Sequence, residues 1–229
     1  MEHDGASEFW HDERPWDEFA WEAFLREQDG RTERYMELEA EFRGLPDAEE
    51  RIAREMGWEF PPCLGSDSPE CSECDHRFSC DWCDDDDDEP IEALNDQGKR
   101  VYEDDPLWRR AQQVAVRLHR YFGSRRRAAE SASISGLLTQ AAMITAKIAG
   151  GRSMGFSRDA LGGNIASHKR AMNHTLLSLA ALDEAEVADA APAGVAARFR
   201  GELLGVRERL MDRIIELRRM FYSGQFSEE

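Results

Sequence analysis

Apolar residues recur at intervals of three and four through the second half of the chain, the spacing that gives a helix one apolar face. Four such runs predict four helices within residues 106–223. The clearest run consists of Phe199, Leu203, Val206, Leu210, Ile214, Leu217 and Phe221. The other runs are Trp108, Ala115, Leu118, Phe122; Ile134, Leu138, Ala141, Thr145, Ile148; and Leu161, Ile165, Met172, Leu176, Leu179. Because short polar connections separate the runs, we expect an up-down four-helix bundle that folds on its own core.

The first half of the chain has a weaker helical pattern. Apolar and aromatic positions from Pro15 to residue 42 predict a helix that Gly30 weakens without ending it. A turn and a short helix should follow, with Ile52 and Met56 facing inward. The whole chain is therefore expected to be all-α. Its predicted parts are a disordered tail (1–14), N-terminal helices (15–62), a cysteine metal loop with an acidic linker (63–105), the bundle (106–223) and a tail (224–229).

Charge divides the chain at the same boundary. Residues 1–105 hold 10 basic and 35 acidic side chains, a net charge of −25, whereas residues 106–229 hold 19 and 12, a net charge of +7. Opposite charges on the two halves favour a protein partner or self-association, and docking of the acidic half on the basic half would satisfy both. The acidic half would repel nucleic acid at long range, so nucleic acid is the less favoured partner.

All five cysteines lie between Cys63 and Cys83. The chain has no apolar run long enough for a membrane span and no secretory signal pattern near residue 1, so we expect a cytoplasmic protein with reduced thiols. Clustered cysteines in that setting favour a bound metal. The pairs Cys71-x2-Cys74 and Cys80-x2-Cys83 would place four sulfurs around one structural zinc ion and leave Cys63 free. A loop without metal is another interpretation.

A second partition of the cysteines uses Cys63, Cys71, Cys74 and Cys80 and leaves Cys83 free. Its spacing, Cys-x7-Cys-x2-Cys-x5-Cys, resembles the Cys-x6-Cys-x2-Cys-x5-Cys iron–sulfur loop of the endonuclease III family of DNA glycosylases. Its second part is similar to the iron–sulfur site of certain CRISPR-associated exonucleases. The resemblance covers about 20 residues and implies a 4Fe–4S cluster as the alternative cofactor. It carries no enzyme activity, because neither helix–hairpin–helix glycines nor a nuclease acid–lysine motif accompanies it.

Five consecutive aspartates, residues 84–88, follow the cysteines. A calcium loop would need a turn glycine where Glu89 stands and a closing acid where Asn95 stands, so the run does not fit one. Runs of like charge are usually solvated, which favours an acidic segment without a bound ion. The alternative is docking of this segment on arginines of this chain or of a partner.

The predicted bundle contains two further candidate sites. Asn164 and His174, on a stripe of small and polar residues, together with His168 beside it, could line a small-molecule cleft. Buried histidines are, however, more often hydrogen-bonded core residues, and the nearby GGRSMG and LGGN glycines lack the preceding strand of a phosphate loop. A basic patch could hold phosphates or an acidic segment. It consists of Arg110, Arg117, Arg120, Arg125, Arg126 and Arg127.

No nucleophile with a neighbouring base and no carboxylate pair follows from these spacings, so we assign no catalytic residue and lean against an enzyme. We interpret the chain as a non-catalytic cytoplasmic interaction or regulatory protein with a structural four-cysteine zinc site. One alternative is an iron–sulfur protein with a redox, sensing or nucleic-acid-associated role. The other is a helical-bundle enzyme or sensor with a small-molecule cleft.

Overall fold

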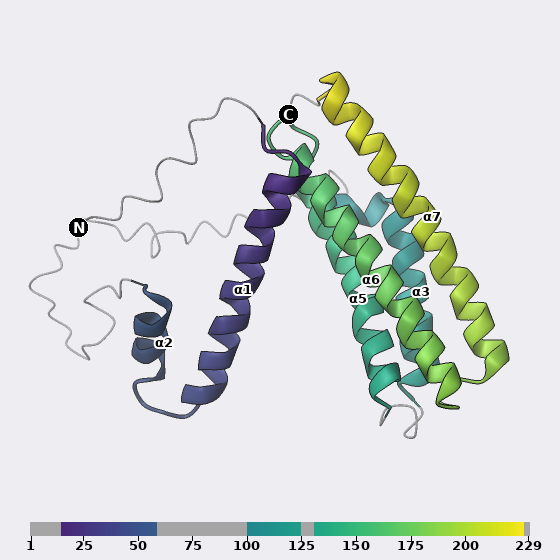
Figure 1. Cartoon of the computed structure of the whole chain (residues 1–229), viewed down its shortest axis with the longest axis horizontal. Coiled ribbons are helices and arrows are strands. Elements are labelled where there is room, and N and C mark those ends of the chain that lie inside the picture. Colours follow the sequence, from purple (N-terminus) through teal and green to yellow (C-terminus); the bar gives the residue numbers. More distant parts are fainter. Residues whose placement is uncertain (1–14, 59–99, 125–130, 227–229) are drawn as a thin grey trace, which may run out of the picture. The chain divides into compact units, whose positions relative to one another are not determined.

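The computed structural model of the chain describes residues 15–58, 100–124 and 131–226. These residues form six α-helices and one 3-10 helix and contain no strand, which confirms the all-α class (Figure 1). The helices are α1 (Glu18–Phe42), α2 (Ala48–Met56), η2 (Val101–Asp104), α3 (Pro106–Phe122), α5 (Ala132–Ser153), α6 (Leu161–Val187) and α7 (Ala193–Ser223). None of them has the length and apolar character needed to cross a membrane. The predicted tail over residues 1–14 lies outside the described residues.

The described residues belong to two compact units. Residues 15–22 and 100–226 form the larger one, which we call the helical body, and residues 23–58 form the small unit. In the small unit, α1 continues through Gly30 as predicted, and Ile52 of α2 is buried. Met56, also predicted to face inward, is only half-buried. Tyr35 stacks on Trp58 with ring centroids 5.8 Å apart, which ties α1 to the residues after α2.

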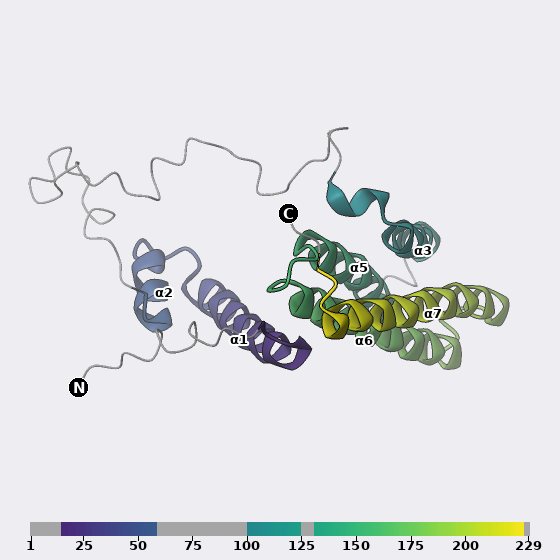
Figure 2. The ribbon, with the colours of Figure 1, turned by 90° about the horizontal axis from the view of Figure 1, so that it is seen from above.

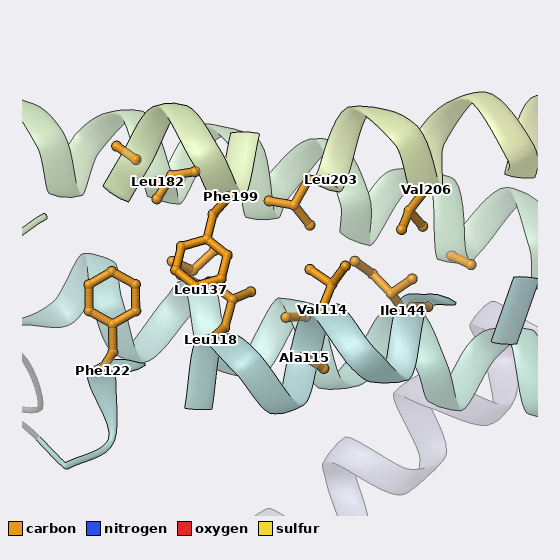
Figure 3. Packing of buried hydrophobic residues seen from close by; sticks show 14 of the residues in the cluster. Val114, Ala115, Leu118, Phe122, Leu137, Ile144, Leu182, Phe199, Leu203 and Val206 are labelled. Atoms are coloured by element: carbon orange, nitrogen blue, oxygen red, sulfur yellow. The ribbon is translucent and has the colours of Figure 1, made fainter. Parts of the chain in front are cut away.

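Four helices of the helical body enclose one apolar core. α5 packs against α3 and α6, and α7 packs against the same two helices, as the two views in Figures 1 and 2 show. Figure 3 shows Val114 of α3, Leu137 of α5 and Leu203 of α7 among the side chains that fill the space between these helices. The apolar stripe predicted for α7 is confirmed from Phe199 to Leu217, whose members are buried.

The buried face of α5 is rotated by one residue at two positions of the predicted stripe. Leu137 and Ile144 are buried, whereas the predicted Leu138 and Thr145 are half-buried. The actual buried stripe follows alternating intervals of three and four, which keeps one narrow seam facing the neighbouring helices. It consists of Ile134, Leu137, Ala141, Ile144 and Ile148. Because Leu137 and Leu138 are neighbours of equal apolar character, the sequence pattern alone did not determine which of them is buried.

The buried face of α6 is mostly small and polar. The predicted Leu161 and Ile165 are buried, but the predicted Leu176 is 47% exposed. Thr175 and Ser178 are buried instead, and their hydroxyls donate to carbonyl oxygens one turn earlier in α6, at 2.8 and 2.9 Å. A hydroxyl satisfied within its own helix costs little to bury, and its small size lets a neighbouring helix approach closely.

Candidate functional site

The cysteines predicted to bind a metal lie outside the described residues, and so does the aspartate run at residues 84–88. Those cysteines are Cys63, Cys71, Cys74, Cys80 and Cys83. Within the described ranges, no group of three His, Cys, Asp or Glu side chains is arranged to hold a metal ion. What the structure does define is how α6 and α7 hold residues 15–22, before the small unit, and how α7 holds Asp105, after this stretch.

Residues 15–22, which we call the N-terminal anchor, are held on α6 and α7 by a buried carboxylate. Glu18, in the first turn of α1, is 4% exposed. Its two oxygens accept hydrogen bonds from Nε and Nη2 of Arg218 on α7, each 2.8 Å long. Lys169 Nζ of α6 lies 2.9 Å from Glu18 Oε2. Arg170 of α6 adds a third ion pair, with its Nε 2.9 Å from Oε2 of Glu22.

Two tryptophans complete the contact between the N-terminal anchor and α6. Trp16 and Trp21 meet edge to face with ring centroids 5.7 Å apart, and Trp21 Nε1 donates to the Asp159 carbonyl oxygen at 3.2 Å. A Cβ added to Gly163 would lie 2.9 Å from the Trp21 ring, and one added to Gly162 would collide with the Trp16 carbonyl oxygen. These glycines of the LGGN sequence therefore provide room for the anchor.

The ionisation of Glu18 reflects its surroundings. Burial acts to raise the pKa of the Glu18 carboxyl, but hydrogen bonds from Arg218 and Lys169, with their positive charges, outweigh burial and hold the pKa below its ordinary value. The hydrogen bond to Glu18 also raises the pKa of the Arg218 guanidinium. The Glu18 carboxylate and the Arg218 guanidinium are therefore charged at neutral pH.

Asp105 fixes the chain where it returns to the helical body. This residue is 5% exposed and caps α3, since its Oδ1 accepts from the backbone N–H of Leu107 at 2.7 Å and of Trp108 at 3.4 Å. Its Oδ2 lies 3.3 Å from Nη2 of Arg213 on α7. The rings of Tyr102 and Trp108 pack with centroids 5.1 Å apart. The N-terminus of α3 is thus tied to α7 by charge and to η2 by packing.

Two of the predicted cleft residues lie together inside the helical body. Asn164 and His168 are buried one turn apart on α6, and His168 Nδ1 is 2.9 Å from the Asn164 carbonyl oxygen. Asn164 Nδ2 donates to the Gly155 carbonyl oxygen at 2.8 Å. Asn164 Oδ1 and His168 Nε2 have no hydrogen-bond partner among the described residues. The third, His174, lies farther along α6, with Nδ1 2.6 Å from Gln140 Oε1 of α5.

Two hollows in the surface of the helical body lie away from these three residues. One has a volume of about 240 Å³ and lies between the N-terminus of α3 and α7. The other, of about 460 Å³, lies on α3 and α5 and has a mostly apolar lining. The residues lining the second are His119, Ser135, Leu138, Thr139, Ala142 and Met143. Neither hollow is lined by Asn164, His168 or His174.

Burial is the main influence on His168. It lowers the pKa of the imidazole, while the hydrogen bond to the Asn164 carbonyl and the charge of Asp105 act to raise it, and Arg213 and Arg152 lower it further. The net result is a pKa below the ordinary value, so His168 is neutral at pH 7. Its position suits a hydrogen-bonded residue of the core.

The arginines of the predicted basic patch differ in their exposure and in their partners. Arg120 is exposed, Arg110 is half-buried, and Arg117 Nη2 lies 3.0 Å from Glu202 Oε2 of α7. Residues 125–127 lie outside the described residues. The cations that receive acidic partners from the N-terminal anchor are Lys169, Arg170 and Arg218. No local pattern in the sequence points to these cations, because 148 to 200 residues separate each of them from its partner.

Comparisons with known proteins give no family to which this site could be assigned. Neither a family model, nor a curated protein, nor a solved structure matches the chain. A function must therefore be inferred from its own residues and contacts.

Proposed function

We propose that the chain is a non-catalytic cytoplasmic interaction or regulatory protein, built on an up-down four-helix bundle, with a zinc ion bound by a cysteine loop. The ligands in this proposal are Cys71, Cys74, Cys80 and Cys83. The observation that supports it concerns the chain on either side of the cysteines. The buried carboxylates of Glu18 and Asp105 hold, on one helical body, the two points of the chain between which the small unit and the cysteines lie.

A segment with both flanks held on one body is a closed loop, and a metal bound within it restricts the loop further. Structural zinc supplies apparent folding free energy on the order of 10 kcal/mol in small domains, which exceeds the cost of ordering a few residues. Binding or loss of the metal would therefore change the order of the acidic segment that the body carries. A partner protein that recognises this segment would then respond to the metal.

The zinc proposal is tested by measuring zinc, iron and acid-labile sulfide per chain in protein purified without oxygen. We expect one zinc, no sulfide and a colourless protein. Cys83→Ser should lower zinc occupancy much more than Cys63→Ser, because only Cys83 belongs to the two Cys-x2-Cys pairs. Equal occupancy in both variants and the parent chain would contradict this ligand set.

The spacing of Cys63, Cys71, Cys74 and Cys80 supports an iron–sulfur protein with a redox, sensing or nucleic-acid-associated role as the second candidate. The same two variants then have opposite effects. A brown protein that absorbs broadly near ~400 nm, loses its cluster in Cys63→Ser and keeps it in Cys83→Ser would replace the zinc assignment.

The regulatory part of the proposal is tested by hydrogen exchange on the full chain. Cys74→Ser removes a ligand shared by both cysteine partitions. We expect it, or chelation, to speed exchange within residues 60–90, with exchange in α7 unchanged as an internal control. Unchanged exchange at residues 60–90 in a chain that contains no metal would refute the proposed function.

A further inference from the structure

The N-terminal anchor occupies a site on α6 and α7 whose chemistry is defined by its contacts. We call this the anchor site, and it consists of Gly162, Gly163, Lys169, Arg170 and Arg218. Its three cations pair with the carboxylates of Glu18 and Glu22. Its two glycines lie against Trp16 and Trp21. The site therefore fits the start of a helix that carries two acids one turn apart and a tryptophan for each glycine.

The anchor site does not depend on the anchor for its form. Leu161 and Ile165 of α6 pack with Ile214 and Leu217 of α7 in a buried cluster that contains no residue of the anchor. The main core of the helical body contains none either. Because these contacts hold α6 against α7, we expect the site to keep its form when the anchor leaves it.

The covalent connection of the anchor does not determine which molecule it binds. Residues 23–99 join the anchor to the rest of the helical body. A connection of this length can reach a second molecule, because an extended chain spans about 3.3 Å per residue. The position of the anchor is therefore determined by its ion pairs and its tryptophan contacts. Neither kind of contact distinguishes the anchor of one copy from that of another.

We infer that the anchor site also accepts residues 15–22 of a second copy of this chain, so that two copies can exchange their anchors. The contacts are identical in both arrangements, and only the entropy of closing the connecting loop differs. A reciprocal exchange makes the two copies equivalent, as a two-fold dimer requires. A tethered segment has an effective concentration of at most about 1 mM, so the parent chain at micromolar concentration keeps its own anchor. Exchange dominates when the anchor no longer fits the site of its own chain.

A second copy is the occupant that satisfies every contact of the site. An unrelated acidic segment could pair with Lys169 and Arg218, but it would also need a second acid one helical turn later for Arg170 and a tryptophan at each glycine. The anchor of a second copy carries all of these groups at the observed positions. The inference goes beyond the proposed function and does not depend on the cysteines.

Two full-length chains with reversed charges test the exchange. The first carries Glu18→Arg, and the second carries Lys169→Glu together with Arg218→Glu. Neither anchor fits the site of its own chain, because like charges meet there. Each chain alone should sediment at the chain mass of 26.1 kDa. An equal mixture at ~20 µM should sediment at twice that mass, because each anchor then finds a site of opposite charge only on the other chain.

A chain with all three substitutions is the matched control. Its anchor and its site again carry opposite charges, so it should be a monomer and should melt closer to the parent chain than either reversed chain does. The parent chain mixed with the second chain should also remain monomeric, because the basic site of the parent chain already holds its own anchor.

Circular dichroism confirms that each chain is folded, and the pair Glu18→Lys and Arg218→Glu provides the same test with fewer changes. A mixture that stays monomeric although the control chain regains stability would overturn the inference. A control chain no more stable than the reversed chains would overturn it too, because these charges would then not define the site. Repeating the mixture after chelation separates the inference from the metal proposal, since the heterodimer should persist.

Discussion

Among single residues, Glu18 links the N-terminal anchor to two helices at once. Glu18→Gln keeps the size of this side chain but removes the charge that faces Arg218 and Lys169. The two cations are partly exposed, which reduces the penalty below that of a fully buried pair. We expect the free energy of unfolding to fall by about 2 kcal/mol in urea titrations. Glu27→Gln, at an exposed position of the same helix, is the control and should change little.

His168 should make stability depend on pH. The unfolded chain takes up a proton at this residue near pH ~6.5, whereas the folded state resists protonation because the imidazole is buried near Arg152 and Arg213. The unfolded state therefore binds more protons below that pH, so the free energy of unfolding decreases as the pH falls from about 7 to 5. Nearby Asp105 opposes this effect without reversing it.

The His168→Gln variant isolates this contribution. It should have a flatter dependence of unfolding free energy on pH between about 7 and 5 than the parent chain, whatever its stability at pH 7. His119→Gln changes an exposed histidine and should keep the parent dependence. Parallel curves for the parent chain and His168→Gln would show that His168 is protonated equally in both states.

At the scale of elements, two neighbouring glycines of α5 should respond in opposite directions to the same change. Gly150 is exposed, and a Cβ there meets nothing within 4 Å. Gly150→Ala should therefore stabilise the chain by about 1 kcal/mol through helix propensity. A Cβ on buried Gly151 would lie 2.8 Å from His168 Nδ1 and 3.0 Å from Ser167 Cβ. Gly151→Ala should destabilise the chain by about 1–3 kcal/mol, because α5 and α6 must move apart.

Melting curves of the two glycine variants check this prediction. Because the substitutions are chemically identical and adjacent, a difference between them reports on packing against α6 and not on helix propensity. Equal stabilisation by both would mean that α5 and α6 are not as close at Gly151 as the structure has them.

Apolar spacing in the sequence predicts the buried face of α7 but not that of α6. The stripe of α7 was predicted correctly because its buried members follow an unbroken spacing of three and four from Phe199 to Leu217. In α6, large residues such as Leu176 face outward and Thr175 is buried. The reason is that a close helix–helix contact selects small residues, whereas a spacing rule selects large ones. Apolar spacing therefore locates a helix reliably but identifies its buried face only when the neighbouring helix is distant enough to need large side chains.

At the scale of the whole molecule, the charges of the two halves do not by themselves determine which acids and bases meet. The opposite charges of the two halves indicated docking of acids on the helical body, and Arg117 and its neighbours were the expected acceptors. The acids of the N-terminal anchor instead meet Lys169 and Arg218, on two other helices. Composition reports only that opposite charges exist. Which of them meet depends on the tertiary packing that brings α6 and α7 together.

The N-terminal anchor adds contacts to the bundle from outside its predicted boundary. The bundle was predicted to fold alone from residue 106, yet Trp16 and Trp21 pack on its α6 glycines. A chain lacking residues 1–22 should remain helical, because the core of α3, α5, α6 and α7 does not include the anchor. It should nevertheless melt about 5 °C lower than a chain lacking only residues 1–14, since it loses two tryptophan contacts and three ion pairs.

The two truncated chains differ by eight residues, so their comparison isolates the anchor from everything before it. Hydrogen exchange should localise the effect: the amides of Gly162 and Gly163 should exchange faster without the anchor, whereas those around Leu203 in the core of α7 should exchange at the same rate. Equal melting temperatures and equal exchange at both glycines would place the anchor outside the folding unit. Faster exchange confined to the start of α6 would show that residues 15–22 stabilise α6, despite the long stretch of chain between them.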